Sequence, residues 1–287
     1  MHSFSPGRPH WWQWATILSL DAPAVAVAWQ WLFARSIGST LNWHHHAILA
    51  TAVWLAYSAD RWIEGWRLPS EQVQTQRHHF YQRHRWFTFA LWLSVLIASV
   101  TLSLLKLHSR ELIAGLILLI PVALYLLSHQ LVHRHHPLRV PKELCVALLF
   151  AGGISVFSIA QTALTFSSHG VLLILFGMLC FADCALISIW EDEVDRQHGQ
   201  TSLALQYPSG RRLVPWLPWG ITLIAFGFTL HADESLRFAL FCIAASGVLL
   251  GIVDRLHRTW GRQLSRALAD LTLLTPAFLW LWLTFKT

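Results

Sequence analysis

Two groups of acidic residues have a spacing that places their side chains on one face of a helix. Asp60 and Glu64 are four residues apart in YSADRWIEGWR. Glu191 and Asp195 are four apart in IWEDEVDRQHGQTS, with Asp192 between them. Side chains at this spacing are neighbours, and like charges there repel each other. Carboxylates close to lipid are also costly unless they face a cavity or a counter-ion. Each group is therefore expected to face positive charge.

A divalent cation would relieve this repulsion if both groups ended on the same side of a membrane. Magnesium fits best, because it takes oxygen ligands, keeps several waters and is commonly held by a few carboxylates together with substrate phosphates. We therefore expect Mg²⁺ as the cofactor, bound by the five acids Asp60, Glu64, Glu191, Asp192 and Asp195.

Basic residues near the acids are candidates for binding the phosphates of a diphosphate substrate. They are Lys142, Arg77, Arg83 and Arg211. Guanidinium and ammonium groups donate charge-assisted hydrogen bonds to phosphate oxygens. Membrane topology alone also explains basic residues at these positions, so both interpretations stay open.

Three further acids lie inside expected membrane helices. An intramembrane acid is a functional-site hypothesis by default. Asp183 either lines the floor of a cavity or pairs with a neighbouring helix. Asp270 either binds substrate or pairs with Arg266, four residues before it, and Asp21 precedes a proline and is consistent with a helix break.

The elements that carry these residues are predicted to be membrane helices. Of the 287 residues, 55% are hydrophobic and 13% are charged, and the mean hydropathy is +0.46. A bilayer core needs about 20 apolar residues per helix, and several such windows occur. We expect an all-α integral membrane protein, a single domain over residues 1–287, with about nine spans: 14–34, 44–64, 86–106, 110–131, 142–163, 170–190, 212–231, 236–254 and 265–285.

The positions of Lys and Arg predict the orientation. With a cytoplasmic N-terminus, only five of the 21 basic residues fall on the other side, namely Arg35, Lys106, Arg110, Arg237 and Lys286. Cytoplasmic loops carry such an excess of positive charge. Both acidic groups then lie on the cytoplasmic side. The net charge of +6 is explained by topology, and no soluble basic domain indicates a nucleic-acid partner.

At these residues the sequence resembles the UbiA superfamily of intramembrane prenyltransferases, which have nine helices. That family has an NDxxDxxxD motif at the second helix and a DxxxD motif at the sixth. The segment AYSADRWIE resembles the first, with Ala56 and Tyr57 in place of its leading Asn and Asp, then Asp60 and Glu64. Losing those two oxygen donors puts a two-magnesium arrangement in doubt.

The second motif and two other segments extend the resemblance. Glu191 and Asp195 occupy its two acidic positions, followed by Gly199 and Thr201. In HPLRVPKELCVALLFAGG, Lys142 stands at the position of a phosphate-contacting lysine of the family. The segment RALADLTLLTP, with Asp270, resembles a part of divergent bacterial members.

The resemblance implies Mg²⁺-dependent transfer of an isoprenyl group from a prenyl diphosphate to an aromatic or lipid acceptor. The leaving diphosphate would be stabilised by the metal and the basic residues, and Tyr57 with other aromatic side chains would shield the allylic cation. It also implies a bacterial inner-membrane protein with its site on the cytoplasmic side. The acceptor and the length of the prenyl chain leave no trace in the sequence.

Two other interpretations stay open. The substitutions at Ala56 and Tyr57 are consistent with a UbiA-fold protein whose catalysis is altered or lost, such as a lipid-phosphate binder, a transporter or a terpene cyclase. Clustered histidines are consistent with a di-iron membrane oxidase, because imidazole is a ligand for iron. These histidines are His79, His84, His129, His133, His135 and His136.

Overall fold

The computed structural model describes residues 9–67, 76–128, 140–162, 166–197 and 202–286, and these residues form helices and turns without a β-strand. The first half contains α1 (Gln13–Ile17), α2 (Asp21–Ser36), α3 (Trp43–Arg67), α4 (Gln76–Arg83), α5 (Arg85–Lys106), α6 (Ser109–Leu127) and α7 (Lys142–Gln161). The second half contains α8 (Phe166–Trp190), α9 (Asp192–Gln197), α10 (Leu203–Gln206), the 3₁₀ turns η3 (Pro208–Arg212) and η4 (Val214–Trp216), α11 (Leu217–Thr229), α12 (Glu234–Trp260), α13 (Arg262–Thr272) and α14 (Thr275–Lys286). The predicted all-helical class is confirmed.

Within the part of the chain that the structure describes, five helices are long and apolar enough to cross a membrane: α5, α6, α7, α8 from His169 onward, and α12. Few residues in the apolar windows of α5 and α6 are buried inside the protein. Their surface carries large aliphatic side chains such as Leu105 and Ile117. Since a soluble protein rarely exposes such a continuous apolar surface, these helices are lipid-facing, and the chain is a membrane protein. The count of nine spans stays a prediction.

The first expected span is interrupted. The helix α1 ends at Ile17, and Ser19 adopts a left-handed conformation with φ of 57° before α2 begins at Asp21. Pro23 lies in the first turn of α2, where a missing backbone N–H breaks no helical hydrogen bond. The continuous span expected over residues 14–34 is therefore wrong in detail, and the break brings Asp21 to a helix start.

The last expected span is also divided. The helix α13 ends at Thr272 and α14 begins at Thr275, one residue before Pro276, which has no backbone N–H to donate. The buried indole of Trp29 in α2 donates to the carbonyl oxygen of Leu273 at 2.7 Å. This bond occupies a carbonyl that the break leaves without a helical partner.

The seventh expected span is shorter than its window of 212–231. Residues up to Trp216 form η3 and η4, and regular helix runs only from Leu217 to Thr229. Pro208, Pro215 and Pro218 lie at the starts of η3, η4 and α11 and explain the delay, because proline fits the first turn of a helix but disfavours its interior. At 1.5 Å per residue, α11 extends about 20 Å, less than the roughly 30 Å of a bilayer core.

The core lies where α2, α7, α8, α11 and α12 pack together. Trp29 of α2 and Phe176 of α8 are fully buried there, with ring centroids 4.7 Å apart. The helices α11 and α12 approach closely at Gly247, where a Cβ would lie 2.9 Å from the carbonyl oxygen of Pro218.

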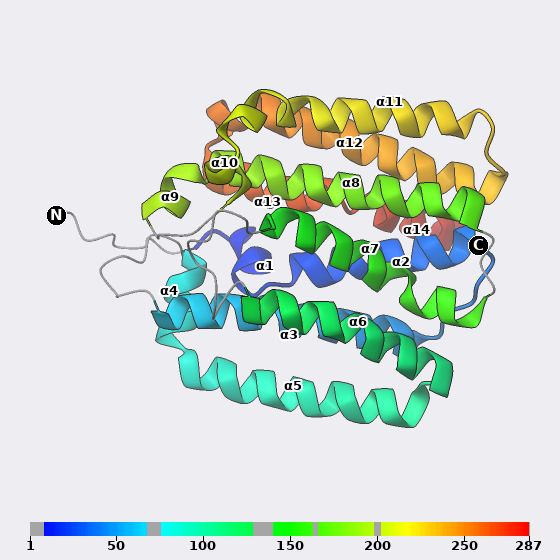
Figure 1. The fold of residues 1–287 in the computed structure, drawn as a ribbon, viewed down its shortest axis with the longest axis horizontal. Coiled ribbons are helices and arrows are strands. Elements are labelled where there is room, and N and C mark those ends of the chain that lie inside the picture. The colour runs from blue at the N-terminus through cyan, green and yellow to red at the C-terminus, as the bar shows by residue number, and fades with distance from the viewer. Residues whose placement is uncertain (1–8, 68–75, 129–139, 163–165, 198–201, 287) are drawn as a thin grey trace.

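The short helices gather at one end of the bundle. Figure 1 shows α4, α9 and α10 at the left, where α7 begins and α8 ends. There α9 and α10 pack against α8, α10 packs against η3, and α13 contacts α8. This end carries the second acidic group, and the long helices hold its segments in place.

Candidate functional site

Glu191 follows the last residue of α8, and its carboxylate binds two arginines from distant segments. Arg77 of α4 donates from Nη2 to Oε2 of Glu191 at 3.5 Å, and Nη1 of Arg266 in α13 donates to the same oxygen. The three side chains are 12–18% exposed. The charge of Lys142, at the start of α7, also acts on Glu191. Glu191, which directly follows α8, is thus hydrogen-bonded to α4 and to α13, and the positive charge at the start of α7 also acts on it.

The charge of Glu191 is fixed by these neighbours. Burial alone would raise the pKa of its carboxyl group, but the guanidinium groups of Arg266 and Arg77 hold that pKa well below its usual range. Glu191 therefore stays ionised throughout the neutral range. A permanent negative charge at this position anchors basic side chains that are also able to bind phosphate.

Asp192 binds a second pair of arginines. Its Oδ2 accepts a hydrogen bond from Nη2 of Arg211 at 2.5 Å, and Nη2 of Arg196 lies 3.7 Å away. Arg211 also donates from Nε to the carbonyl oxygen of Ala204 at 3.3 Å, which fixes η3 against α10. Asp192 is about a quarter exposed, so this pair lies nearer the surface than Glu191.

The third acid of this group, Asp195, is 5% exposed. Its backbone N–H donates to the carbonyl oxygen of Glu191 at 2.9 Å, so the two residues are joined across one helical turn. The four-residue spacing therefore places them on adjacent turns, as predicted. Arg83, expected beside the acids, has an exposed side chain at the end of α4.

The first acidic group lies near the end of α3. Asp60 is half-buried, and the side chain of Glu64 lies outside the part of the chain that the structure describes. Between them, the buried Arg61 donates to the carbonyl oxygen of Thr16 at 3.4 Å. The guanidinium group of Arg61 also lies 6.0 Å from the ring centroid of Tyr57. The end of α3 is thereby attached to α1.

The acids inside the helices form a cluster in which Asp183 is buried and Asp21 and Asp270 are half-buried. Asp183 of α8 and Asp270 of α13 lie close enough for their charges to interact, and both interact with Asp21 at the start of α2. Asp270 also shares a hydrogen bond with Asp21. The structure thus joins three acids that the sequence leaves in separate helices, and Arg266 carries the positive charge beside them.

The sequence predicts Arg266 only as a possible partner of Asp270, and not as a residue of the acidic site. Its four-residue spacing from Asp270 is visible in the sequence, but its hydrogen bond to Glu191 depends on how α13 lies against α8. A basic residue inside an expected membrane span was the available signal, because such residues face other charged groups.

The donor set suits magnesium by its chemistry, because carboxylate oxygens are the ligands that Mg²⁺ prefers. Asp195 contributes a buried carboxylate and Asp60 a half-buried one. Among the residues that the structure describes, no group of three or more His, Cys, Asp or Glu side chains is arranged as a metal site. The ligand assignment stays a prediction.

The structure describes only two of the six histidines that suggested a di-iron site. His79 and His84 lie in and just after α4. His129, His133, His135 and His136 lie outside the described residues. His45, near the start of α3, has a structural role, since its Nε2 lies 3.2 Å from Oε1 of the buried Glu111.

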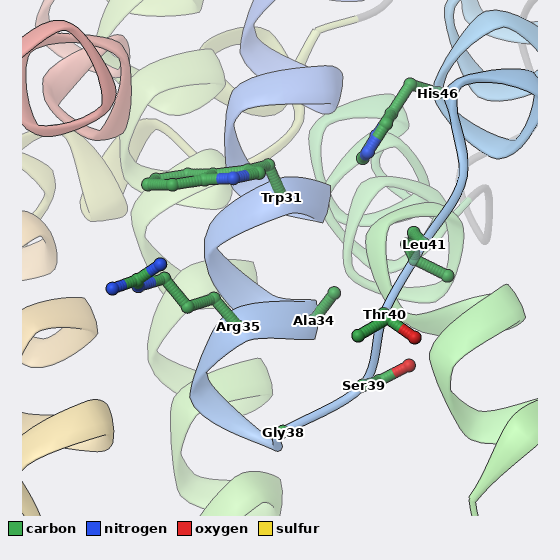
Figure 2. A pocket seen from close by; sticks show the side chains of 8 residues that line it. All are labelled: Trp31, Ala34, Arg35, Gly38, Ser39, Thr40, Leu41 and His46. Carbon is green, nitrogen blue, oxygen red and sulfur yellow. The ribbon is translucent and has the colours of Figure 1, made fainter. Parts of the chain in front are cut away.

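A cavity of about 360 Å³ lies at the C-terminal end of α2, whereas Asp21 lies at the start of this helix. Figure 2 shows Trp31 and Arg35 of α2 on one side and His46 of α3 on the other, with the connecting segment from Gly38 to Leu41 beneath. The guanidinium group of Arg35 lies 5.9 Å from the ring centroid of Trp31. Since α2 extends about 24 Å, this cavity is separate from the acidic groups.

Comparisons with known proteins identify the fold. No family model matches the sequence, and no curated protein matches it. The structure is similar to the apo structure of a UbiA homolog from Aeropyrum pernix K1, with a TM-score of 0.57 and 14% sequence identity. The similarity covers 91% of this chain and 96% of that chain. At this identity the comparison shows the fold alone.

Proposed function

We propose that this chain, which has the fold of a UbiA homolog, is an intramembrane prenyltransferase. In this proposal it transfers an isoprenyl group from a prenyl diphosphate to a hydrophobic aromatic or lipid acceptor, with Mg²⁺ as cofactor. The site lies at the end of the bundle where α8 and α9 meet, and we assign that end to the cytoplasmic side of a bacterial inner membrane.

The observation that carries this proposal is the alternation of acids and bases at that end. Glu191 and Asp192 are adjacent, yet each binds its own arginines, Arg77 with Arg266 and Arg211 with Arg196. Buried carboxylates need such partners for stability. The same guanidinium groups are geometrically suited to phosphate oxygens.

Different residues have different roles when the allylic C–O bond breaks. We assign Arg77, Arg211 and Lys142 to the phosphate oxygens, where their positive charge favours the leaving diphosphate as its negative charge grows. Glu191 holds Arg77 in place before the substrate binds. A part for Arg83 and Glu64 in the site stays a prediction.

Magnesium supplies further charge stabilisation for the diphosphate when it is bound. Asp60, Glu64, Glu191, Asp192 and Asp195 are the candidate ligands. Tyr57, at the position of a motif acid, is assigned to the wall of the isoprenyl site, where its ring packs edge-on against Phe150.

Binding of geranylgeranyl diphosphate to the detergent-purified chain tests the proposal. We expect a rise in the thermal unfolding midpoint that requires Mg²⁺, because a ligand stabilises the state that binds it. An Asp60→Ala, Asp195→Ala double variant is expected to lose the rise. Glu193→Ala is the matched control, since Glu193 belongs to the same acidic segment but is exposed.

A wild-type protein that stays folded yet shows no shift with shorter or longer prenyl diphosphates would contradict the proposal. The second candidate, a lipid-phosphate binder without transferase activity, is favoured by the replacement of two motif oxygen donors by Ala56 and Tyr57. It predicts binding of the diphosphate without its consumption, which phosphate release measures directly.

A further inference from the structure

The cluster of Asp21, Asp183 and Asp270 has a feature that internal pairing does not account for. Asp183 is 4% exposed, and its Oδ1 has no hydrogen-bond partner among the residues that the structure describes. A buried oxygen without a partner is costly. The charges of Arg266 and Asp21 act on this carboxyl group. The oxygen without a partner is therefore part of the acidic cluster.

The cluster has more acidic than basic side chains. Arg266 acts on Asp183, Asp270 and Asp21, but it also donates to Glu191. The hydrogen bond between Asp270 and Asp21 requires a proton on one of them, because an ionised carboxylate is only an acceptor. Asp183 therefore has only the shared charge of Arg266 to balance a negative charge on its carboxyl group, in surroundings of low dielectric constant.

An aromatic ring adjoins these acids. Tyr57 of α3 lies close enough to Asp270 and Asp21 for their charges to act on it. Faces of aromatic rings attract cations, and acids strengthen that preference. Asp183 is eight residues before Glu191 on α8, and Asp270 is one turn beyond Arg266 on α13. The cluster therefore lies about one to two helical turns deeper than the proposed diphosphate site.

We propose that Asp183, together with Asp21, Asp270 and Tyr57, binds the positive charge that develops on the isoprenyl chain. The inference rests on the proposed function. When the C–O bond to diphosphate breaks, the bonding electron pair leaves with the diphosphate, and the allylic carbons carry one positive charge. No proton or electron passes to the carboxylates, which act only by electrostatic attraction.

Geranylgeranylamine is a suitable probe, because it is protonated at neutral pH and carries its charge at the end of the same chain. Geranylgeraniol is its neutral counterpart. Binding of both is measured by calorimetry on the detergent-purified chain with Mg²⁺ and inorganic diphosphate present. We expect the wild type to bind the amine at least about tenfold more tightly than the alcohol, as befits a desolvated charge pair.

The Asp183→Asn variant keeps the size of the side chain and removes its charge. We expect it to bind the amine about thirtyfold more weakly, while geranylgeranyl diphosphate and the alcohol bind as they do to the wild type. Asp254→Asn is the matched control: Asp254 is a mostly buried acid of α12 that binds the indole of Trp190 at 3.2 Å. This control is expected to bind all three probes like the wild type.

Equal binding of amine and alcohol by the wild type would overturn the cation site whatever the variants do, and so would an unchanged amine affinity in a folded Asp183→Asn protein. If Asp183→Asn does not fold, Asp270→Asn with the same probes takes its place. A wild type that binds the amine and alcohol alike but still binds the diphosphate refutes this inference alone. A wild type that binds no prenyl diphosphate refutes the proposed function, and this inference with it.

Discussion

At the scale of single residues, Glu191 is central to the candidate site, because it binds two arginines that are mostly buried. Replacing it by glutamine keeps the volume but leaves Arg77 and Arg266 without their carboxylate. Breaking a buried ion pair from one side costs about 3 kcal/mol or more. We expect Glu191→Gln to lower the free energy of unfolding by that amount in detergent, measured by denaturant titration.

The matched control for this change is Glu193→Gln, two residues away on an exposed side chain. Surface substitutions of this kind usually change stability by less than about 0.5 kcal/mol. If both variants lost a similar free energy of unfolding, the negative charge of the segment as a whole, and not the two arginine contacts of Glu191, would support the fold.

The depressed pKa of Glu191 makes a separate prediction about pH. Since its folded-state pKa lies below the unfolded value of about 4.3, the stabilisation is fully present above that value and is lost as pH falls through the folded pKa. The stability difference between wild type and Glu191→Gln is therefore expected to stay constant from about pH 6 to 8 and to shrink only below about pH 4.3. Unfolding series at several pH values measure it, and a difference that changes near neutrality would refute the assigned contacts.

The sequence predicts the types and turn spacing of the site residues, but not their partners. Glu191 and Asp195 do lie one turn apart, because their separation is short and local. Arg266 and Arg77 reach Glu191 from 75 and 114 residues away. Such contacts depend on how α4 and α13 are placed by the whole bundle, which no local pattern encodes.

At the scale of elements, the contact of α11 with α12 depends on a missing side chain. A Cβ at Gly247 would lie 2.9 Å from the backbone oxygen of Pro218 and would clash with Thr222. Backbone cannot yield as a flexible side chain does, and overpacking costs about 1–3 kcal/mol. We expect Gly247→Ala to lower the free energy of unfolding by that amount.

Gly227→Ala in α11 is the control, since a Cβ there would meet nothing within 4 Å. Alanine is the better helix former by roughly 1 kcal/mol, so this variant is expected to be neutral or slightly more stable. Equal destabilisation by both substitutions, measured in the same detergent, would show that close packing at Gly247 is not the cause.

The helix order could be predicted because hydrophobic windows report directly on membrane helices. The positions at which two of these expected helices break could not be predicted. The chain turns at Ser19 and at Leu273 inside windows that are mainly apolar, and the second break is supported by a hydrogen bond from Trp29, 244 residues away. Proline at 23 and 276 marks each place, yet Pro121 lies inside α6 without ending it. Proline alone therefore does not decide where a helix stops.

At the scale of the whole molecule, the orientation in the membrane is the prediction with the widest consequence, because it decides which compartment supplies the substrate. Basic residues such as Arg211 and Arg212 gather at the end with the acidic groups, whereas the turn before α12 has few. Two exposed serines at opposite ends, Ser209 of η3 and Ser235 at the start of α12, allow a direct test by single Ser→Cys substitutions.

A maleimide that cannot cross membranes is expected to label Ser235→Cys in intact cells and Ser209→Cys only after the membrane is opened. The wild type is the background control, because Cys145, Cys180, Cys184 and Cys242 are buried or half-buried. Labelling in the reverse order would place the acidic end outside, where cytoplasmic prenyl diphosphates do not reach it. That outcome would remove the proposed donor from contact with Glu191 and Asp192 even if the fold and every ion pair were correct.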